Sequence, residues 1–117
     1  MSELPCIHSI LVQISDMDRS LAFWRDGLGL PFVLQEEGST CWECVLGGVK
    51  ILLHPAWADA VGGQGAIIEI AVADVDAIHA RLVAQGHAPE APPQDRPWGR
   101  TLGLIDPDGY MIGVTTR

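Results

Sequence analysis

Cys41 and Cys44 have the spacing C-x-x-C, a pattern that can do redox or metal chemistry. The pattern works when a turn or a helix start brings the two sulfurs together. On a strand, residues three apart point to opposite faces, and the chain has no second cysteine pair that would complete a zinc site. We therefore expect neither a redox nor a metal role for these cysteines.

Glu69 and His54 are the candidate acid–base residues. Glu69 stands among apolar residues of a predicted strand, where it would meet a ligand cation or act as a general base. The alternative is an ion pair of Glu69 with Lys50 or with an arginine near the rim of the site. His54 ends a predicted strand, where it would donate a hydrogen bond to a ligand or act as an acid–base group. The alternative is that it lies at a solvent-exposed strand terminus.

Three of the four tryptophans are candidates for ligand contact. Trp24 falls on the apolar stripe of a predicted helix, so it is expected in the core. Trp42, Trp57 and Trp98 fall on a strand or in loops, where aromatic faces can stack on a planar or cationic ligand. Packing at the rim or at a dimer contact is the alternative for each of them.

The elements that must position these residues are predicted by periodicity. Apolar residues alternate over residues 7–14, and Ser15 or Asp16 then caps a helix whose stripe is Leu21, Trp24 and Leu28. Strands are predicted at 30–36, 40–46 and 49–54. After a Gly-rich stretch, a strand at 67–73 precedes a helix capped by Asp74, and a Pro-rich segment leads to strands at 100–105 and 110–115.

The two halves of the chain match each other. At one constant offset Ile10, Val12 and Ile14 align with Ile68, Ile70 and Val72, and the cap Asp16 aligns with Asp74. This self-similarity indicates an internal duplication. We expect a single domain over 1–117, made of a first module (about 5–55), a linker (about 56–65) and a second module (about 66–117).

Five tracts of the chain, in this order, resemble the vicinal-oxygen-chelate superfamily of glyoxalases, bleomycin-resistance proteins and dioxygenases. They are Ile14-Ser15-Asp16, Phe23-Trp24-Arg25-Asp26-Gly27-Leu28-Gly29-Leu30, Val72-Ala73-Asp74-Val75-Asp76, Pro97-Trp98-Gly99-Arg100 and Asp106-Pro107-Asp108-Gly109-Tyr110. The resemblance implies an α+β fold in which two paired βαβββ modules form a cupped mixed sheet with helices on the outer face.

Enzymes of this superfamily hold a divalent metal with His and Glu side chains from the cup. The resemblance places the four ligand positions on Ser9, Leu52, Ile67 and Gly113, with His54 available if the strand register shifts. These side chains do not make a transition-metal site. His8 lies one residue from a ligand position, and so on the wrong face of its strand. We expect no metal and no other cofactor.

Among metal-free members, the chain looks most like the bleomycin-resistance proteins, which bind rather than transform. The resemblance implies a homodimer with two ligand grooves. The residues expected to line the site are Ser9, Leu11, Gln13, Trp42, Leu52, His54, Trp57, Ile67, Glu69, Trp98, Met111 and Gly113.

The composition of the chain restricts the classes of molecule that it is expected to bind. Seven Lys and Arg against fifteen Asp and Glu give a formal charge of −8, which disfavours nucleic acid and anionic membranes and favours cationic ligands. The chain shows neither a signal peptide nor an apolar run that could span a membrane, and its three cysteines are an odd number, so we expect a cytoplasmic protein with reduced thiols.

Two functions from different classes follow. The first is a metal-free protein that binds and sequesters an aromatic or cationic antibiotic or metabolite. The alternative is a glyoxalase-like isomerase, lyase or dioxygenase that uses a metal at a non-standard position, through His8, His54 and Glu69, or a Glu/His acid–base pair without metal. We expect binding rather than catalysis.

Overall fold

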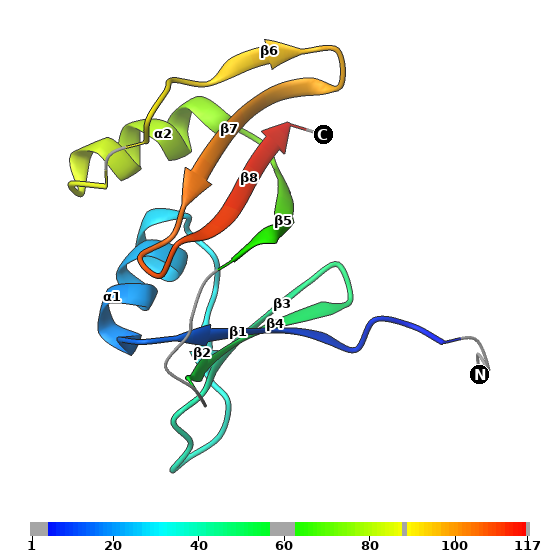
Figure 1. Cartoon of the computed structure of the whole chain (residues 1–117), viewed down its shortest axis with the longest axis vertical. Helices are drawn as coiled ribbons and strands as arrows, with labels where there is room; N and C mark the ends of the chain where they lie inside the picture. The colour runs from blue at the N-terminus through cyan, green and yellow to red at the C-terminus, as the bar shows by residue number, and fades with distance from the viewer. Residues whose placement is uncertain (1–4, 57–62, 88, 117) are drawn as a thin grey trace.

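The computed structural model describes residues 5–56, 63–87 and 89–116. The first half contains β1 (Ser9–Ile14), α1 (Met17–Leu21), the π-helical segment η1 (Ala22–Gly27), β2 (Val33–Leu34), β3 (Trp42–Leu46) and β4 (Val49–Pro55). The second half contains β5 (Gly63–Val72), α2 (Val75–Ala84), β6 (Gln94–Arg96), β7 (Gly99–Ile105) and β8 (Tyr110–Thr116). The order of strand, helix and three strands thus occurs twice (Figure 1).

Each half forms a four-stranded sheet with the same strand order. The order is β1-β4-β3-β2 in the first sheet and β5-β8-β7-β6 in the second. In each sheet the first and last strands of the module pair in parallel, whereas the other neighbours pair antiparallel. This arrangement confirms the predicted α+β fold of two βαβββ modules. None of the described helices is long and apolar enough to cross a membrane.

Both helices begin at an aspartate cap, which is Asp74 as predicted for α2 and Asp16, one of the two predicted candidates, for α1. The backbone N–H of Arg19 donates to Oδ1 of Asp16 at 3.1 Å, and that of Ala77 donates to Oδ1 of Asp74 at 3.0 Å. Each carboxylate satisfies a backbone donor that the first turn of a helix leaves without an intrahelical partner. The caps therefore fix where each strand gives way to its helix.

The first helix departs from the regular α-helix that its apolar stripe predicts. It widens into η1, where the backbone N–H of Leu28 donates to the carbonyl oxygen of Phe23 at 2.8 Å. Gly27 is buried in this segment, and a Cβ added to it would lie 2.7 Å from Cδ2 of Leu82 in α2. The absence of a side chain therefore permits the close approach of η1 and α2.

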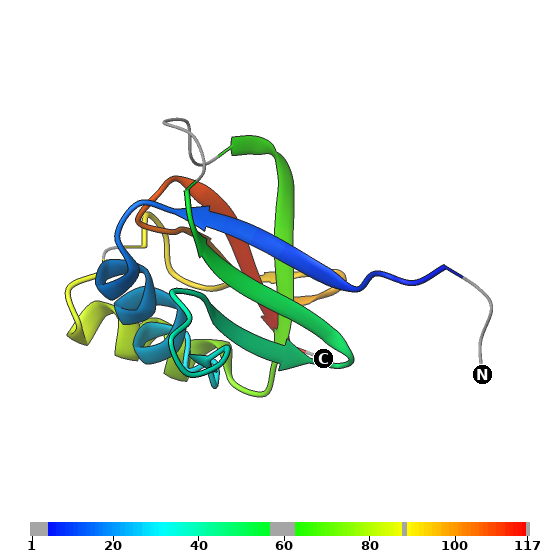
Figure 2. The same ribbon diagram turned by 90° about the horizontal axis from the view of Figure 1, so that it is seen from below.

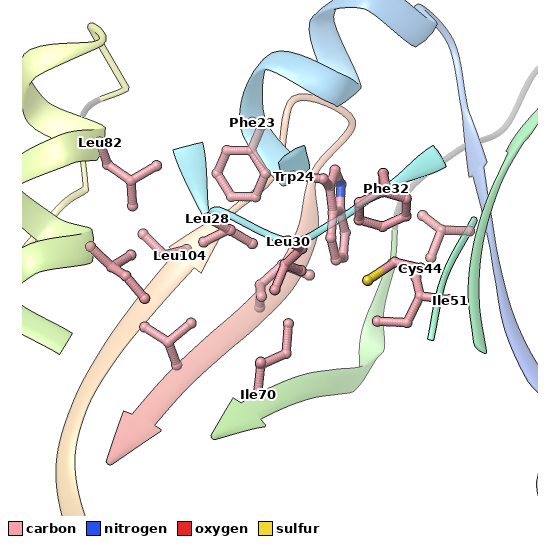
Figure 3. Close-up of a cluster of buried hydrophobic side chains, with 14 of the residues drawn as sticks. Phe23, Trp24, Leu28, Leu30, Phe32, Cys44, Ile51, Ile70, Leu82 and Leu104 are labelled. Carbon is pink, nitrogen blue, oxygen red and sulfur yellow. The ribbon is translucent and has the colours of Figure 1, made fainter. Parts of the chain in front are cut away.

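One hydrophobic core lies between the two sheets, and the helices complete it from one side (Figures 1 and 2). Figure 3 shows side chains of both halves meeting there, among them Trp24 and Ile51 from the first half and Ile70 and Leu104 from the second. Trp24 is completely buried, which confirms its predicted place in the core. Because both modules contribute to one core, neither sheet has a core of its own.

Three predicted boundaries are wrong. The strand expected at 30–36 is reduced to Val33–Leu34, because Leu30 and Phe32 turn into the core on either side of Pro31. β6 forms inside the Pro-rich segment, and β5 begins at Gly63, inside the expected linker. In the last two cases the partner strand offers free hydrogen-bonding groups, which composition cannot reveal.

Candidate functional site

Each sheet has one face directed away from the shared core and from the helices that complete it. We call these two helix-free faces the first and second outer faces. On the first outer face, Leu11 lies opposite Leu52 and Gln13 opposite His54. Leu52 and His54, two residues apart on β4, therefore share one face. The rest of this face is made by Ser9, Glu43, Val45 and Lys50.

Two polar contacts shape the first outer face. The half-buried ring of His54 has its Nδ1 2.6 Å from the carbonyl oxygen of Pro55. Since a carbonyl oxygen can only accept, Nδ1 carries the proton in this contact. Lys50 lies 3.0 Å from Glu43 and pairs with it, so the alternative of an ion pair between Lys50 and Glu69 is not formed. The Glu43 and Lys50 side chains partly neutralise each other on this face.

The second outer face consists of three rows of residues that run across β5, β8 and β7. The first row is apolar and contains Ile67, Met111 and Ile105. The middle row contains Glu69, Gly113 and Gly103. The last row carries small groups, from Ala71, Thr115 and Thr101. One carboxylate thus stands beside two glycines, with apolar side chains at one end and hydroxyl groups at the other.

A hollow of about 760 Å³ lies against the second outer face and is also lined by residues outside that face, including Arg19, Phe23 and Leu104. The three rows supply its floor, except for Ala71, and the connection between α2 and β6 supplies a wall through Pro89 and Pro92. Trp98, at the tip of the β6–β7 hairpin, lies at its rim. None of the residues of the first outer face lines this hollow. A single chain therefore does not bring all the predicted site residues around one cavity.

Glu69 is the acidic group on the floor of this hollow. Its side chain is exposed, and within residues 5–56, 63–87 and 89–116 its carboxylate makes no hydrogen bond or ion pair. A carboxylate in a concave site with apolar walls attracts a cation or a hydrogen-bond donor. Glu69 is therefore available to a ligand.

The tryptophans occupy different environments. Trp42 shares the core-directed side of β3 with Cys44, packs against the hydrophobic core and carries the Arg25 guanidinium 5.6 Å from its ring centroid. It thus lies on the face of β3 opposite Glu43. Trp98 is exposed at the rim of the hollow. Trp57 lies outside the described residues.

The C-x-x-C cysteines are both buried and free. Burial raises the pKa of the Cys44 thiol, which disfavours the reactive thiolate. Neither thiol lines the hollow. Burial therefore gives this pair a packing role.

The residues at the family's metal-ligand positions do not fit a divalent metal. Ser9 and Leu52 lie on the first outer face, whereas Ile67 and Gly113 lie on the second. Only the Ser9 hydroxyl offers a donor atom, and the described part of the chain contains no group of three His, Cys, Asp or Glu residues placed to hold a metal. We derive no metal chemistry for this site.

Protein purified without chelator is expected to contain no stoichiometric divalent metal, because the four positions lack imidazole and carboxylate donors. The measurement is elemental analysis by mass spectrometry after extensive dialysis, with a known zinc protein processed in parallel. One metal ion per chain, lost on replacement of two of His8, His54 and Glu69, would refute this prediction.

Sequence reasoning missed much of the hollow, including Thr101, Gly103 and Ile105 of β7. They alternate along the predicted strand at 100–105 with the buried Leu102 and Leu104, so the alternation itself was a usable signal. The sequence did not show that β7 pairs with β8, which brings Gly103 beside Gly113.

Residues 6–114 match the Glyoxalase/Bleomycin resistance protein/Dioxygenase superfamily, so the chain belongs to that family. This match covers nearly the whole chain and agrees with the paired βαβββ modules. A search of curated proteins found no match to the chain.

Solved structures of the same fold have different functions. TnmS3, an antibiotic binding protein from Streptomyces sp. CB03234, is 24% identical with a TM-score of 0.76, and the match covers 99% of this chain and 98% of that one. A glyoxalase/bleomycin resistance protein from the same organism is 25% identical with a TM-score of 0.73, over 95% and 100% of the two chains. Lactoylglutathione lyase from Agrobacterium tumefaciens is 23% identical with a TM-score of 0.68, over 98% and 96%. The fold is thus common to binding proteins and enzymes.

Proposed function

We propose that this protein binds a small aromatic cation, such as a basic antibiotic or metabolite, and sequesters it without a resident metal. The observation that carries the proposal is the Glu69 carboxylate, which has no partner among the described residues and stands on the floor of a hollow with an apolar end. A bound ring would exclude water from this carboxylate, which strengthens its attraction for a positive group.

Apolar and aromatic groups of the hollow agree with such a ligand, and Glu90 adds a second carboxylate to its lining, whereas Arg19 and Arg96 add positive charge. Ile67, Met111 and Ile105 offer apolar contact to a ring system, and the exposed Trp98 at the rim offers an aromatic face. The formal charge of −8 attracts cations over the whole surface. That TnmS3 is an antibiotic binding protein adds support from a protein of the same fold. The three cysteines of the present chain are all described and all free, which accords with a cytoplasmic location.

Glu69→Gln is expected to weaken cationic aromatic ligands about tenfold or more and to leave neutral aromatic ligands nearly unchanged, because it removes the charge but keeps the shape. Ligands are found by thermal shift, where a compound at 100 times its Kd adds roughly 2.7 kcal/mol to stability. Affinities are then measured by calorimetry. Glu36→Gln, an exposed acid that does not line the hollow, is the matched control.

If Glu69→Gln and Glu36→Gln have the same small effect on cationic ligands, Glu69 does not contact the ligand. A failure of all basic aromatic compounds to raise the melting temperature of the wild type would contradict the proposed ligand class.

An acid–base enzyme is less well supported. His54 lies on the first outer face and Glu69 on the second, so within one chain they do not flank a common substrate. General acid–base catalysis requires both groups within hydrogen-bond reach of the reacting atoms. We therefore propose binding as the function of the single-chain site.

We also propose that the protein forms a homodimer, and light scattering at micromolar concentration is expected to give twice the mass of 12.6 kDa. Large apolar side chains on both outer faces are exposed in the single chain, including Ile67 at 52% and Ile105 at 56%. A second copy that joins its first outer face to the second outer face of this one would cover them and bring together the predicted site residues that lie on the two outer faces. A monomeric mass at this concentration would contradict the proposal.

A further inference from the structure

Two glycines occupy the middle of the second outer face. Gly103 in β7 and Gly113 in β8 are direct partners in the antiparallel ladder, and Glu69 in β5 is the partner of Gly113 on the other side. Strand interiors disfavour glycine, because it loses the most backbone entropy on folding and offers no side chain to pack. Two glycines side by side in central strand positions therefore require a reason.

Neither the backbone conformation nor the packing of the sheet requires glycine at these two positions. Neither glycine has a positive φ, in contrast to Gly29, Gly99 and Gly109. A Cβ built on Gly103 would meet no atom within 4 Å, and one on Gly113 would meet only Cγ of Glu69, at an ordinary 3.4 Å. Both positions would accept alanine without strain. Glycine in a strand that neither bends nor packs closely on another segment often marks a place where a ligand approaches the backbone.

Together the two glycines leave a flat patch of bare backbone on the floor of the hollow. The flanking rows, with Ile105 and Met111 on one side and Thr101 and Thr115 on the other, each lie two residues away along the strands. At about 3.3 Å per residue, these rows stand roughly 13 Å apart. A flat ring system fits between them against the peptide planes, whereas a globular ligand gains nothing from the missing side chains.

We propose that Gly103 and Gly113 select a planar, fused-ring cation, whose ring lies flat on their backbone and whose positively charged nitrogen points to Glu69. The inference rests on the proposed function and deepens it, because it names the shape of the ligand as well as its charge. The ring edge contacts Ile105 and Met111, and the carboxylate is at the side of the patch, on the adjacent strand. Charge and shape are thus recognised by different residues.

The test uses two cations of different shape. The planar probe is 9-aminoacridine, which is followed by its fluorescence, and the globular probe is 1-adamantylamine, which is followed by calorimetry. Each is titrated into the wild type, Gly103→Ala, Gly113→Ala and Glu69→Gln. Gly65→Ala is the matched control, since a Cβ there also meets nothing within 4 Å and Gly65 does not line the hollow. Melting temperatures of the glycine variants are expected to equal or exceed that of the wild type.

We expect Gly103→Ala and Gly113→Ala each to weaken 9-aminoacridine tenfold or more and to change 1-adamantylamine less than twofold. Glu69→Gln is expected to weaken both cations, and Gly65→Ala neither. If Glu69→Gln weakens 9-aminoacridine while the two glycine variants do not, the inference that Gly103 and Gly113 select a planar ligand is wrong. The proposed function, which depends on Glu69, is then still supported. If neither cation binds the wild type, both proposals fail.

A second copy of the chain is the other candidate to occupy the patch, and the same variants distinguish it. Mass is measured by light scattering for each variant alongside the titrations. A change of oligomeric state in Gly103→Ala or Gly113→Ala, with the affinity for 9-aminoacridine unchanged, would assign the bare backbone to an interface between copies and would overturn the inference.

Discussion

Replacing Trp24 with alanine is expected to lower the free energy of unfolding by about 3–5 kcal/mol, the range for removal of a large buried aromatic side chain. The Trp24 side chain is 0% exposed, makes edge-on contacts with Phe23 and Phe32, and lies where both modules contribute to the core. Its removal would leave a cavity between the two halves of the chain. The loss is measured by urea denaturation, from the midpoint and slope of the unfolding curve.

Trp98→Ala provides a matched control, because it makes the same chemical change at a side chain that is 69% exposed. A surface substitution of this kind is expected to change the free energy of unfolding by about 0.5 kcal/mol or less. Equal losses for Trp24→Ala and Trp98→Ala would contradict a single core shared by the two modules.

Asp106→Asn is expected to cost about 1–3 kcal/mol at neutral pH, although it changes only one atom of a buried side chain. One carboxylate oxygen of Asp106 accepts from Nε1 of Trp24 at 3.1 Å, and the other accepts from the backbone N–H groups of Asp108 and Tyr110. An amide has only one accepting oxygen, so its NH₂ group must face a donor. Either the Trp24 Nε1–H group or the backbone N–H groups of Asp108 and Tyr110 then lose their acceptor.

Asp95→Asn is the matched control for this substitution. Asp95 is highly exposed and pairs with Arg100 at 3.1 Å, so its change is expected to cost about 0–1 kcal/mol. Both variants are measured by urea denaturation under the same conditions. Similar costs for the two substitutions would mean that the hydrogen bonds around Asp106 contribute little to stability.

Asp106→Asn is also expected to change how the free energy of unfolding depends on pH. Burial raises the pKa of Asp106 above its ordinary value of 3.8, although hydrogen bonds from Tyr110, Trp24 and Asp108 oppose part of the rise. Between 3.8 and the raised value, the folded chain binds a proton that the unfolded chain does not, so acidification favours the folded state through this group. The deficit of Asp106→Asn relative to the wild type should therefore widen as pH falls through this window.

Titrations that both proteins share cancel in that difference, which makes it a specific test of Asp106. Denaturation curves of the two proteins at intervals between neutral pH and the onset of acid unfolding give the difference directly. A deficit that stays constant, or that narrows on acidification, would show that the carboxyl group does not have a raised pKa in the folded chain.

Local features of the fold could be predicted from the sequence. The caps Asp16 and Asp74 form the expected hydrogen bonds, since a cap depends on residues within one turn. Alternation correctly placed Leu11 and Gln13 on one face and Val12 on the other, because side chains on a strand follow the pleat. The duplication was likewise visible, since it depends only on residue type and spacing, and the lack of metal donors follows at the positions that the family resemblance implies.

Much of the candidate site could not be predicted in this way. Lys50 pairs with Glu43 rather than Glu69 because β3 is its neighbour in the sheet, and Gly103 lies beside Gly113 because of the β7–β8 register. Both facts depend on which strands pair, and strand pairing brings together residues distant in sequence. Periodicity assigns a residue to a face of its own strand but not to a neighbour on another.

By itself, the sequence determined most of the elements, their caps and the duplicated order, because these follow from steric preferences and hydrogen bonds over a few residues. Only the tertiary structure decided that the two outer faces point away from one shared core, so that Glu69 lines a hollow from which His54 is absent. That arrangement follows from burial of the apolar faces of both modules, with Trp24 between them, and burial is a property of the whole chain.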